Sequence, residues 1–540
     1  MVQTSSVTPA PARVRIDRGK KYDAAAIAAM LAAPESAQPT WDADGHGTHV
    51  AGTAAGNGAQ GSGCHGAGHH MGVAPAADLV VVKTTFTSTD TMAGVPGGVA
   101  QAGARPCVAN LSLGSESTAH DGSDDEEVEY DAILAATPTG RSIVTTAGNV
   151  GALADVTDPY SPPQGGMHCS KTIAANGTVT MSVVVAANDK KEDWLSIWYG
   201  DATRLSLVIT EPGGAATATI PVGGASYTTP LAGHPMFVWS RTDASSTGRH
   251  RIAIRIEPRT TDPTTIAAGT WVLRLTETAG TGGDVDCWIS RDVKDENPLF
   301  VGADQDRPRT VGSPGPGHSV VTVANYDHRD NTIAESSSRG PTIDTRPAGR
   351  TKPDLAAPGT GIMAPKSGAR GGNCCDCCYD FYVGMSGTSM AAPHVAGIVA
   401  LLLEAEPTLT WDAVRSRLRS SCDPPDPVTG PTLPAATWGA GIVNAKKALG
   451  IPDVAVSDGS AVTAASPAEH RVAGRHAAGA PAVLAGLRGG ALAGPFAELR
   501  ARVLASPQGQ QAVALIGEHY DEVKRLVDTR RRVTVAWHRM

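Results

Sequence analysis

The strongest constraint on the fold is an alternation of strand-like and helical stretches that is interrupted and then resumed. Up to about Ser161, short apolar runs of the kind that buried parallel strands show alternate with helical patterns. Such an alternation predicts a parallel sheet flanked by helices, an α/β fold. The predicted strands cover Leu79–Val82, 107–113 and 142–146, and the predicted helices cover about 92–103 and 123–136.

The interruption, from about Gly165 to Asp292, contains no convincing helix. Short strands recur there between turn-forming glycine pairs, and Arg251–Ile256 alternates charged and apolar residues as a half-exposed antiparallel strand does. The segment therefore predicts an inserted all-β module, a sandwich or jelly roll whose ends lie close together. Its predicted strands are 178–185, 194–198, 205–209, 236–239, 251–256 and 271–275.

The α/β pattern resumes at Val320–Val323 and continues to about Leu449, with its clearest helix from Ser389 to Leu403. An Ala/Gly-rich linker and a helical stretch then close the chain. The predicted organisation is a catalytic domain in two parts, 1–161 and 310–449, a β module at 165–292, and a linker with a helical C-terminal extension at 453–540.

Composition excludes some classes of function. A formal net charge of −8, spread over 540 residues, gives no basic footprint for nucleic acid. No apolar run approaches the roughly 18 residues that span a bilayer, so no membrane span is predicted. Residues Met1–Arg15 have no apolar core of a secretory signal. A cytoplasmic location is favoured on this basis, although the location is left open.

Three short segments, far apart in the sequence, carry residues suited to nucleophilic catalysis. The segment 44–52 places His46 at the start of an Ala/Gly-rich helix, and the segment 387–394 places Ser389 at the start of another. A serine hydroxyl needs a general base, most often histidine, and a helix N-terminus favours the oxyanion that forms on attack. Asn149 follows a predicted buried strand and offers a second oxyanion donor.

These segments resemble the motifs of the subtilase family of serine peptidases. The resemblance rests on Gly-Thr-Ser-Met-Ala-x-Pro around Ser389, Asp-Gly-His-Gly-Thr-His around His46 and Ala-Gly-Asn ending at Asn149. Further similar segments occur in the family's order at 110–114, 337–341, 352–359 and 438–445. The β module and a cysteine-rich loop before Ser389 also resemble the spore-germination branch of the family. A subtilisin-like parallel sheet flanked by helices is therefore expected.

The resemblance implies an endopeptidase that works through an acyl-enzyme. Ser389 would be the nucleophile and His46 the general base, while Asn149 and the Ser389 backbone N–H would hold the oxyanion. Ser112, Leu113 and Gly114 would bind an extended polypeptide substrate. The resemblance allows structural calcium, but no metal ligands are assigned. The alternative is a pseudoprotease that acts as a binding or scaffolding protein. His49 and His394 are expected to be helix-packing residues.

The triad acid is the part of the motif set that the sequence does not supply clearly. Subtilases order their triad Asp, His, Ser along the chain. Upstream of His46 the nearest match is Asp17, but Arg13 and Arg15 interrupt what should be a buried strand. The sequence therefore predicts that the true Asp strand lies upstream of this chain, with Asp17 as the alternative. Asp42 and Asp44 are expected to be loop or cap residues.

The chain has nine cysteines, an odd number that does not suggest a dispersed disulfide framework. Four of them form two overlapping C-x-x-C spacings, too crowded to surround one tetrahedral zinc ion easily. Plain thiols or local disulfides are favoured there, and a metal shared with Cys64, His65, His69 or His70 is the alternative. Cys169 and Cys287 are expected to face one another in the β module. The crowded cysteines are Cys374, Cys375, Cys377 and Cys378.

Overall fold

The structure is a computed structural model, and residues up to Ile451 form one compact unit in it. The predictions for Asp17, for the crowded cysteines and for 453–540 fall outside the described residues. The described residues are 22–32, 42–59, 68–84, 88–154, 165–200, 202–221, 226–241, 247–261, 264–290, 297–343, 351–368, 381–426 and 430–452.

A mostly parallel five-stranded sheet forms the centre of the α/β part, which confirms the predicted fold class. Its order is β1-β2-β13-β14, with β15 on the other edge of β13. The pairs β1–β2, β2–β13 and β13–β15 are parallel, and only the short β14 is antiparallel. The strands are β1 (Cys107–Leu111), β2 (Arg141–Thr146), β13 (Val321–Asp327), β14 (Thr332–Ile333) and β15 (Leu355–Pro358).

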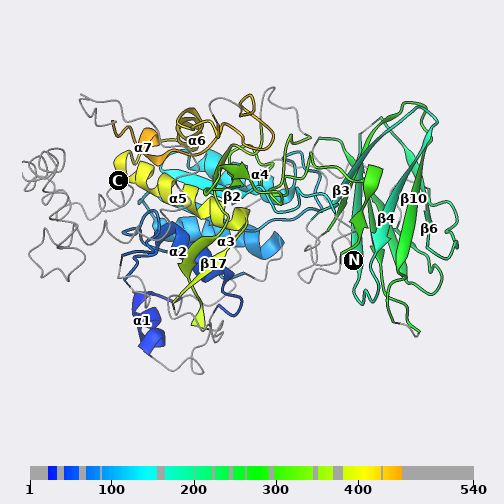
Figure 1. The fold of residues 1–540 in the computed structure, drawn as a ribbon, viewed down its shortest axis with the longest axis horizontal. Helices are drawn as coiled ribbons and strands as arrows, with labels where there is room; N and C mark the ends of the chain where they lie inside the picture. Colours follow the sequence, from blue (N-terminus) through cyan, green and yellow to red (C-terminus); the bar gives the residue numbers. More distant parts are fainter. Residues whose placement is uncertain are drawn as a thin grey trace, which may run out of the picture. The chain divides into compact units, whose positions relative to one another are not determined.

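Helices cover both faces of this sheet. Ile143 and Val144 are neighbours in β2 and so point to opposite faces. Ile143 packs with side chains of α3 and α4, whereas Val144 packs with side chains of α5 (Figure 1). The helices are α1 (Ala24–Ala32), α2 (His46–Ala55), α3 (Ser88–Ala102), α4 (Asp125–Ala136), α5 (Thr388–Ala405), α6 (Trp411–Ser420) and α7 (Ala445–Ala448), with a 3₁₀ turn η2 (Gly302–Asp304).

Helix α5 is the described element long and apolar enough to cross a membrane by length and composition. It also lies in the core, where 67% of the residues in its apolar window are buried. Core helices of globular domains pass the same test, so this helix is weak evidence for a membrane span.

The prediction of a buried strand at Leu79–Val82 is wrong. The segment has no regular secondary structure, and all four side chains are exposed, Val81 to 76%. Apolar, β-branched composition favours a buried strand only where neighbouring strands pair with the backbone. No described strand pairs with this segment, so its side chains stay in solvent.

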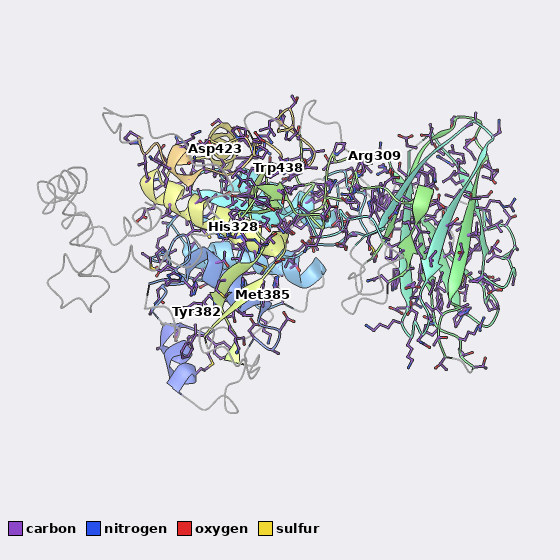
Figure 2. The ribbon with its side chains drawn as sticks, in the orientation of Figure 1. Arg309, His328, Tyr382, Met385, Asp423 and Trp438 are labelled. Carbon is purple, nitrogen blue, oxygen red and sulfur yellow. The ribbon has the colours of Figure 1, made fainter. Side chains whose placement is uncertain are left out.

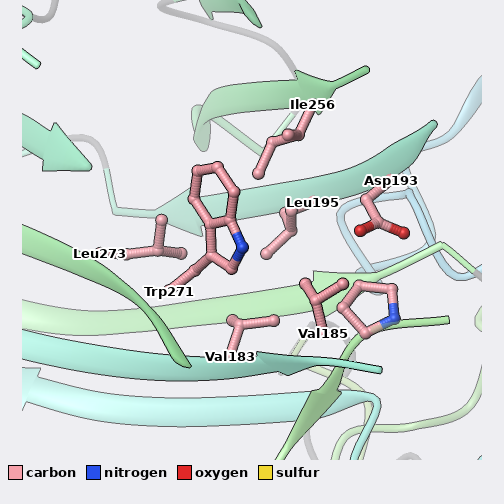
Figure 3. Close-up of a pocket in the computed structure, with 8 residues that line it drawn as sticks. Val183, Val185, Asp193, Leu195, Ile256, Trp271 and Leu273 are labelled. Carbon is pink, nitrogen blue, oxygen red and sulfur yellow. The ribbon is translucent and has the colours of Figure 1, made fainter. Parts of the chain in front are cut away.

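The insertion consists of two antiparallel sheets, of order β12-β4-β10-β6 and β3-β11-β5-β9-β8-β7. Figure 1 shows β4, β10 and β6 side by side. A small pocket within the insertion is lined by apolar side chains, Trp271 among them, and by Asp193 (Figure 3). The strands are β3 (His168–Ile173), β4 (Thr178–Val185), β5 (Asp193–Tyr199), β6 (Leu205–Thr210), β7 (Ser226–Thr228), β8 (Met236–Arg241), β9 (His250–Ile256), β10 (Gly269–Glu277), β11 (Gly283–Ile289) and β12 (Leu299–Phe300).

The first and last long strands of the insertion, β3 and β11, pair with each other, so its ends lie close together as expected. Its strands form sheets separate from the parallel sheet. The predicted strands at 178–185 and 251–256 are present as β4 and β9, and β9 is antiparallel to both neighbours. The jelly-roll topology and the exact domain boundaries stay predictions.

Candidate active site around Ser389

Ser389 is the second residue of α5, in the first turn of that helix. Gly387, immediately before the helix, has φ 151° and ψ 165°, a conformation that side chains rarely adopt. A Cβ at Gly387 would also lie 3.4 Å from Nδ2 of Asn149. Glycine at this position therefore permits the backbone conformation from which α5 starts.

Asn149 lies against the start of α5, where the sequence placed an oxyanion donor. Its Oδ1 accepts hydrogen bonds from the Thr388 backbone N–H at 2.9 Å and from the Thr388 hydroxyl at 3.0 Å. These bonds assign Oδ1 as the acceptor and Nδ2 as the donor end of the amide, and the two atoms lie 3.5 and 3.4 Å, respectively, from the position of a Cβ on Gly387. The amide and the N-terminal N–H groups of α5 can thus donate into the same space.

Ser338 holds the turn that carries Asn149, and its neighbour Ser337 holds the Ser338 segment on β13; sequence reasoning missed both roles. The Ser338 hydroxyl accepts from the Val150 backbone N–H at 3.1 Å, and the Ser338 N–H donates to the Gly148 carbonyl at 2.9 Å. The Ser337 hydroxyl accepts from the Asn325 N–H at 3.0 Å, which ties the same segment to β13. Both serines belong to the segment 337–341, which the sequence analysis identified as similar to a family motif. Neither the periodicity nor the spacing of the sequence indicated that this segment contacts the turn of Asn149.

Ser112 connects the carboxyl end of β1 to Ser389. Its hydroxyl donates to the Ser389 backbone carbonyl at 2.8 Å, and the Ser389 hydroxyl lies 3.5 Å from the Ser112 carbonyl. The Leu113 carbonyl accepts from Thr146 at 3.4 Å. Gly114 is crowded, because a Cβ there would lie 2.8 Å from the Ser313 carbonyl oxygen. The structure therefore brings the predicted Ser112–Gly114 segment to Ser389.

His46 is the first residue of α2, and α2 packs against α5. The carbonyl of Ala54, in α2, lies 3.0 Å from where a Cβ on Gly397 of α5 would be. Ala54 follows His46 by the same number of residues as Gly397 follows Ser389. Nearer the start of α2, Nε2 of His49 lies 3.0 Å from the Val383 carbonyl. Val383 belongs to the strand that precedes α5.

That strand is β17 (Tyr382–Met385), which pairs with β16 (Ile362–Pro365). Tyr382 and Met385, at its two ends, are labelled in Figure 2. His49 is fully buried, and its Nε2 also lies 2.9 Å from the Ile362 carbonyl, so it fastens α2 to both strands. This is the packing contact expected of His49.

The carboxylates just before His46 cap α2. Asp42 accepts from the Gly45 N–H at 2.9 Å, from the Thr48 N–H at 2.7 Å and from the Thr48 hydroxyl at 2.8 Å. Burial opposes ionisation, but these hydrogen bonds lower the pKa of Asp42 below 3.8. Asp44 accepts from the His46 N–H at 3.2 Å. Both residues thus make the cap or loop contacts that the sequence predicts.

The described cysteines, Cys107, Cys169, Cys287 and Cys422, are free thiols. Cys169 and Cys287 are register partners in β3 and β11, so they face one another as predicted. Burial raises the pKa of Cys169 to about 12 and raises that of Cys287 as well, so both are protonated at neutral pH. Within the described ranges, no group of three or more His, Cys, Asp or Glu side chains could hold a metal ion. The calcium implied by the resemblance stays a prediction.

Comparison with known proteins identifies the family. The chain matches the model of the subtilase family over residues 24–262 and 289–447. It is 28% identical over 319 residues to serine protease AprX of Bacillus subtilis (strain 168), covering 54% of this chain and 59% of that protein. It is 31% identical over 183 residues to Bacillopeptidase F of the same organism, covering 32% of this chain and 11% of that protein.

Among solved structures, the Clostridium perfringens CspB protease aligns with a TM-score of 0.62 and 23% identity. The alignment covers 79% of this chain and 84% of that one, which shows a shared fold. The chain spans less than two thirds of the length of the curated relatives named above. The resemblance to the spore-germination branch of the family stays a prediction. Because the family model matches well over half of its residues, this chain belongs to the subtilase family of serine peptidases.

Proposed function

We propose that the chain is a serine endopeptidase that cleaves peptide bonds through an acyl-enzyme. The observation that carries the proposal is the meeting of Ser389, the Asn149 amide and the start of α5. Ser389 attacks the scissile carbonyl, and His46 takes the hydroxyl proton and later gives it to the leaving amine. Water then attacks the acyl-enzyme and releases the second product, which regenerates Ser389.

The oxyanion formed on attack would accept hydrogen bonds from Asn149 Nδ2 and from the Ser389 backbone N–H. Oδ1 of Asn149 is already used by Thr388, so the amide is held with its donor end toward this space. Donors fixed before the reaction need no reorganisation when the charge develops. The substrate would be a polypeptide bound in extended form along Ser112–Gly114, as peptides bind to exposed strands.

The test of this assignment is Ser389→Ala. Removing one hydroxyl from a helix start changes little packing, so the circular dichroism spectrum and the melting temperature should match those of the parent chain. Labelling by a fluorophosphonate probe and cleavage of a denatured protein substrate should both be lost. Labelling that persists in the variant would show that another residue is the nucleophile.

The second candidate is a pseudoprotease that binds polypeptides without cleaving them. The observation that favours it concerns Asp42, a carboxylate close before His46 in the sequence. Its oxygens accept hydrogen bonds from the Gly45 and Thr48 N–H groups at the start of α2, so they already serve as a helix cap. Under this alternative, the parent chain would bind an extended peptide yet remain unlabelled by the fluorophosphonate probe.

A further inference from the structure

The six-stranded sheet of the insertion carries a stripe of aromatic side chains on the face turned away from its apolar core. Trp194 of β5 is directly opposite Arg255 of β9, and Arg255 is directly opposite Phe237 of β8, so the three side chains share one face. Cζ of Arg255 lies 4.2 Å from the ring centroid of Phe237 and 5.3 Å from that of Trp194. The ring of Trp239 lies 5.8 Å from that of Trp194, with 5° between the ring planes. These four residues are called the aromatic stripe.

The same face of the sheet packs against the α/β part. Trp288 of β11 is opposite Ser196, which lies two residues from Trp194 on β5, so Trp288 shares the face of the stripe. Trp288 is fully buried, and His120 of the irregular segment 116–120 stacks on it with ring centroids 4.0 Å apart. This face therefore already binds one segment of polypeptide by stacking of planar side chains.

The stripe continues this interface, but its four side chains are partly exposed. The backbone N–H of Ser290 donates to the Trp194 carbonyl at 2.9 Å, and the Ser290 and Ser117 hydroxyls share a hydrogen bond. Ser117 follows Gly114, the end of the candidate substrate segment, by three residues, which is at most about 11 Å of chain. A polypeptide bound along Ser112–Gly114 that extends past Gly114 can thus reach the stripe.

Two carboxylates beside the stripe favour a cationic ligand. Glu257 pairs with Arg255 at 2.7 Å, whereas Glu192 lies 4.0 Å from the same guanidinium and is 49% exposed. One oxygen of Glu192 accepts from Nε1 of Trp194 at 3.0 Å, which holds the carboxylate beside the indole. An ionised carboxylate accepts several hydrogen bonds. A second guanidinium can therefore stack on the rings, as Arg255 does, and pair with Glu192.

We propose that the aromatic stripe is an exosite, a binding site outside the active site, for an arginine side chain of the polypeptide substrate. The guanidinium of the bound peptide stacks on the indole of Trp194 and pairs with Glu192. Arginine fits better than lysine, because its planar group stacks on aromatic faces. That the peptide is a substrate rests on the proposed peptidase function, whereas binding of the peptide to the stripe does not.

The test measures binding to the Ser389→Ala chain, in which the proposed nucleophile is absent. The probe is the peptide Gly-Ser-Gly-Ser-Gly-Arg-Gly-Ser-Gly-Ser, and the control peptide carries citrulline, a neutral side chain of similar shape, in place of arginine. Calorimetric titration should show binding of the arginine peptide and a loss of affinity of about tenfold with citrulline, because the stacking cation and the ion pair are both lost. Equal affinities, or no binding of the arginine peptide at millimolar concentration, would overturn the exosite.

Glu192→Gln should weaken binding of the arginine peptide by about two- to fivefold and leave the citrulline peptide unaffected. Glutamine keeps an acceptor for the Trp194 N–H, so the ring should stay in place. The matched control is Glu335→Gln, which changes a 72% exposed carboxylate of the α/β part and should alter neither affinity. Trp194→Ala should abolish binding of the arginine peptide. An unchanged affinity in Glu192→Gln would contradict the proposed ion pair.

Kinetics and a second ligand separate this proposal from its alternatives. In the active chain, Glu192→Gln should raise KM for arginine-containing substrates rather than lower kcat, because the stripe contacts substrate away from the reacting bond. A chain that cleaves no substrate would contradict the proposed function, while peptide binding to Ser389→Ala still decides the exosite. Binding of neutral cellohexaose that Trp194→Ala abolishes, without binding of the arginine peptide, would assign the stripe to glycans and overturn the proposal.

Discussion

At the scale of single residues, the side-chain amide of Asn149 has an acceptor, Oδ1, and a donor, Nδ2, with different functions. Oδ1 accepts hydrogen bonds from the Thr388 backbone N–H and hydroxyl, and Nδ2 is the donor end of the same amide. The sequence predicts Asn149 as a functional residue because it follows a strand in a recognisable motif. The bond to Thr388 could not be predicted, because it joins residues that only the fold brings together.

The two ends of this amide can be separated by substitution. Asn149→Ala should lower kcat by about 10² to 10³ with little change in KM, the range known for one oxyanion donor in a subtilisin. Asn149→Asp is the matched variant, because its carboxylate keeps an acceptor for Thr388 but has no N–H to donate. It should lose as much kcat while keeping more of the melting temperature. A change confined to KM in both variants would mean that Asn149 binds the ground state.

Glu127 of α4 is a buried carboxyl that should make the fold less stable as the pH rises. Burial, and then the charge of Asp124, raise the pKa of Glu127 to about 8 from its ordinary 4.5. One carboxylate oxygen accepts from the Asp124 N–H at 3.0 Å, and the whole side chain is buried. Between pH 4.5 and 8 the folded chain keeps a proton that the unfolded chain releases, so stability falls as the pH rises through this window.

Glu127→Gln should remove this dependence, because an amide keeps the acceptor for Asp124 and does not titrate. Urea unfolding at pH 5 and pH 8 should show a smaller loss of free energy of unfolding in the variant than in the parent chain. Asp125→Asn, an exposed carboxyl of the same helix, is the control and should behave like the parent. Parallel pH profiles for Glu127→Gln and the parent would contradict the prediction.

At the scale of elements, strands were predictable where their composition matched their surroundings. β4 was predicted with its exact bounds, since Val and Thr fill it, whereas β3 was missed because His, Cys, Ser and Lys dilute its pattern. Leu79–Val82 failed for the opposite reason: its composition is that of a buried strand, but burial depends on partners that the segment itself does not encode.

A buried ion pair joins β13 to β15, and no pattern in the sequence signalled it. Lys352 is fully buried, and its Nζ donates to the Asp354 carboxylate and to the Val320 carbonyl at 2.8 Å, and to the Thr322 hydroxyl at 2.9 Å. The same Asp354 oxygen accepts from the Thr322 N–H at 2.8 Å. The lysine thus binds three groups along the boundary between the two strands.

Lys352→Met should lower the free energy of unfolding by about 1 to 3 kcal/mol, because it removes one of the two cations that bind the buried Asp354, whose other oxygen still pairs with Arg419 at 3.1 Å. The double variant with Asp354→Asn should regain part of that loss. Lys447→Met, which breaks an exposed pair with Asp423, should cost at most about 1 kcal/mol. Denaturant unfolding measures all three. Equal losses for Lys352→Met and Lys447→Met would show that burial of the pair does not matter.

At the scale of the whole molecule, the insertion is joined to the α/β part by buried contacts. Trp288 of β11 is stacked between His168 of β3 and His120 of the α/β part, with ring centroids 4.8 and 4.0 Å away. Arg249 of the insertion donates to the Ala119 carbonyl at 2.9 Å. These contacts explain why residues up to Ile451 form one compact unit although the sheets are separate.

Asp286 supplies the negative charge that pairs with the basic side chains at the junction between the insertion and the α/β part. It is buried and lies 3.0 Å from Arg249, 3.3 Å from His168 and 2.9 Å from Arg309, which is labelled in Figure 2. Burial opposes its ionisation, but the hydrogen bond from His168 and the positive charges of its neighbours outweigh burial and lower the pKa of Asp286 below 3.8. Its stabilising contribution is therefore complete above about pH 4 and is lost as the pH falls further.

Replacing Asp286 with asparagine should uncouple the two parts of the molecule. The substitution keeps the shape of the side chain but removes the negative charge that pairs with Arg249, His168 and Arg309, at a cost of about 3 kcal/mol at neutral pH. We expect calorimetry to resolve two unfolding transitions in place of the parent's single one, because the insertion keeps its own apolar core. Asp284→Asn, on the same strand but 56% exposed, should leave one transition. As the pH is lowered below 4, the parent should come to resemble Asp286→Asn. A single transition in Asp286→Asn at neutral pH, with an unchanged midpoint, would show that the junction is held by packing on Trp288 alone.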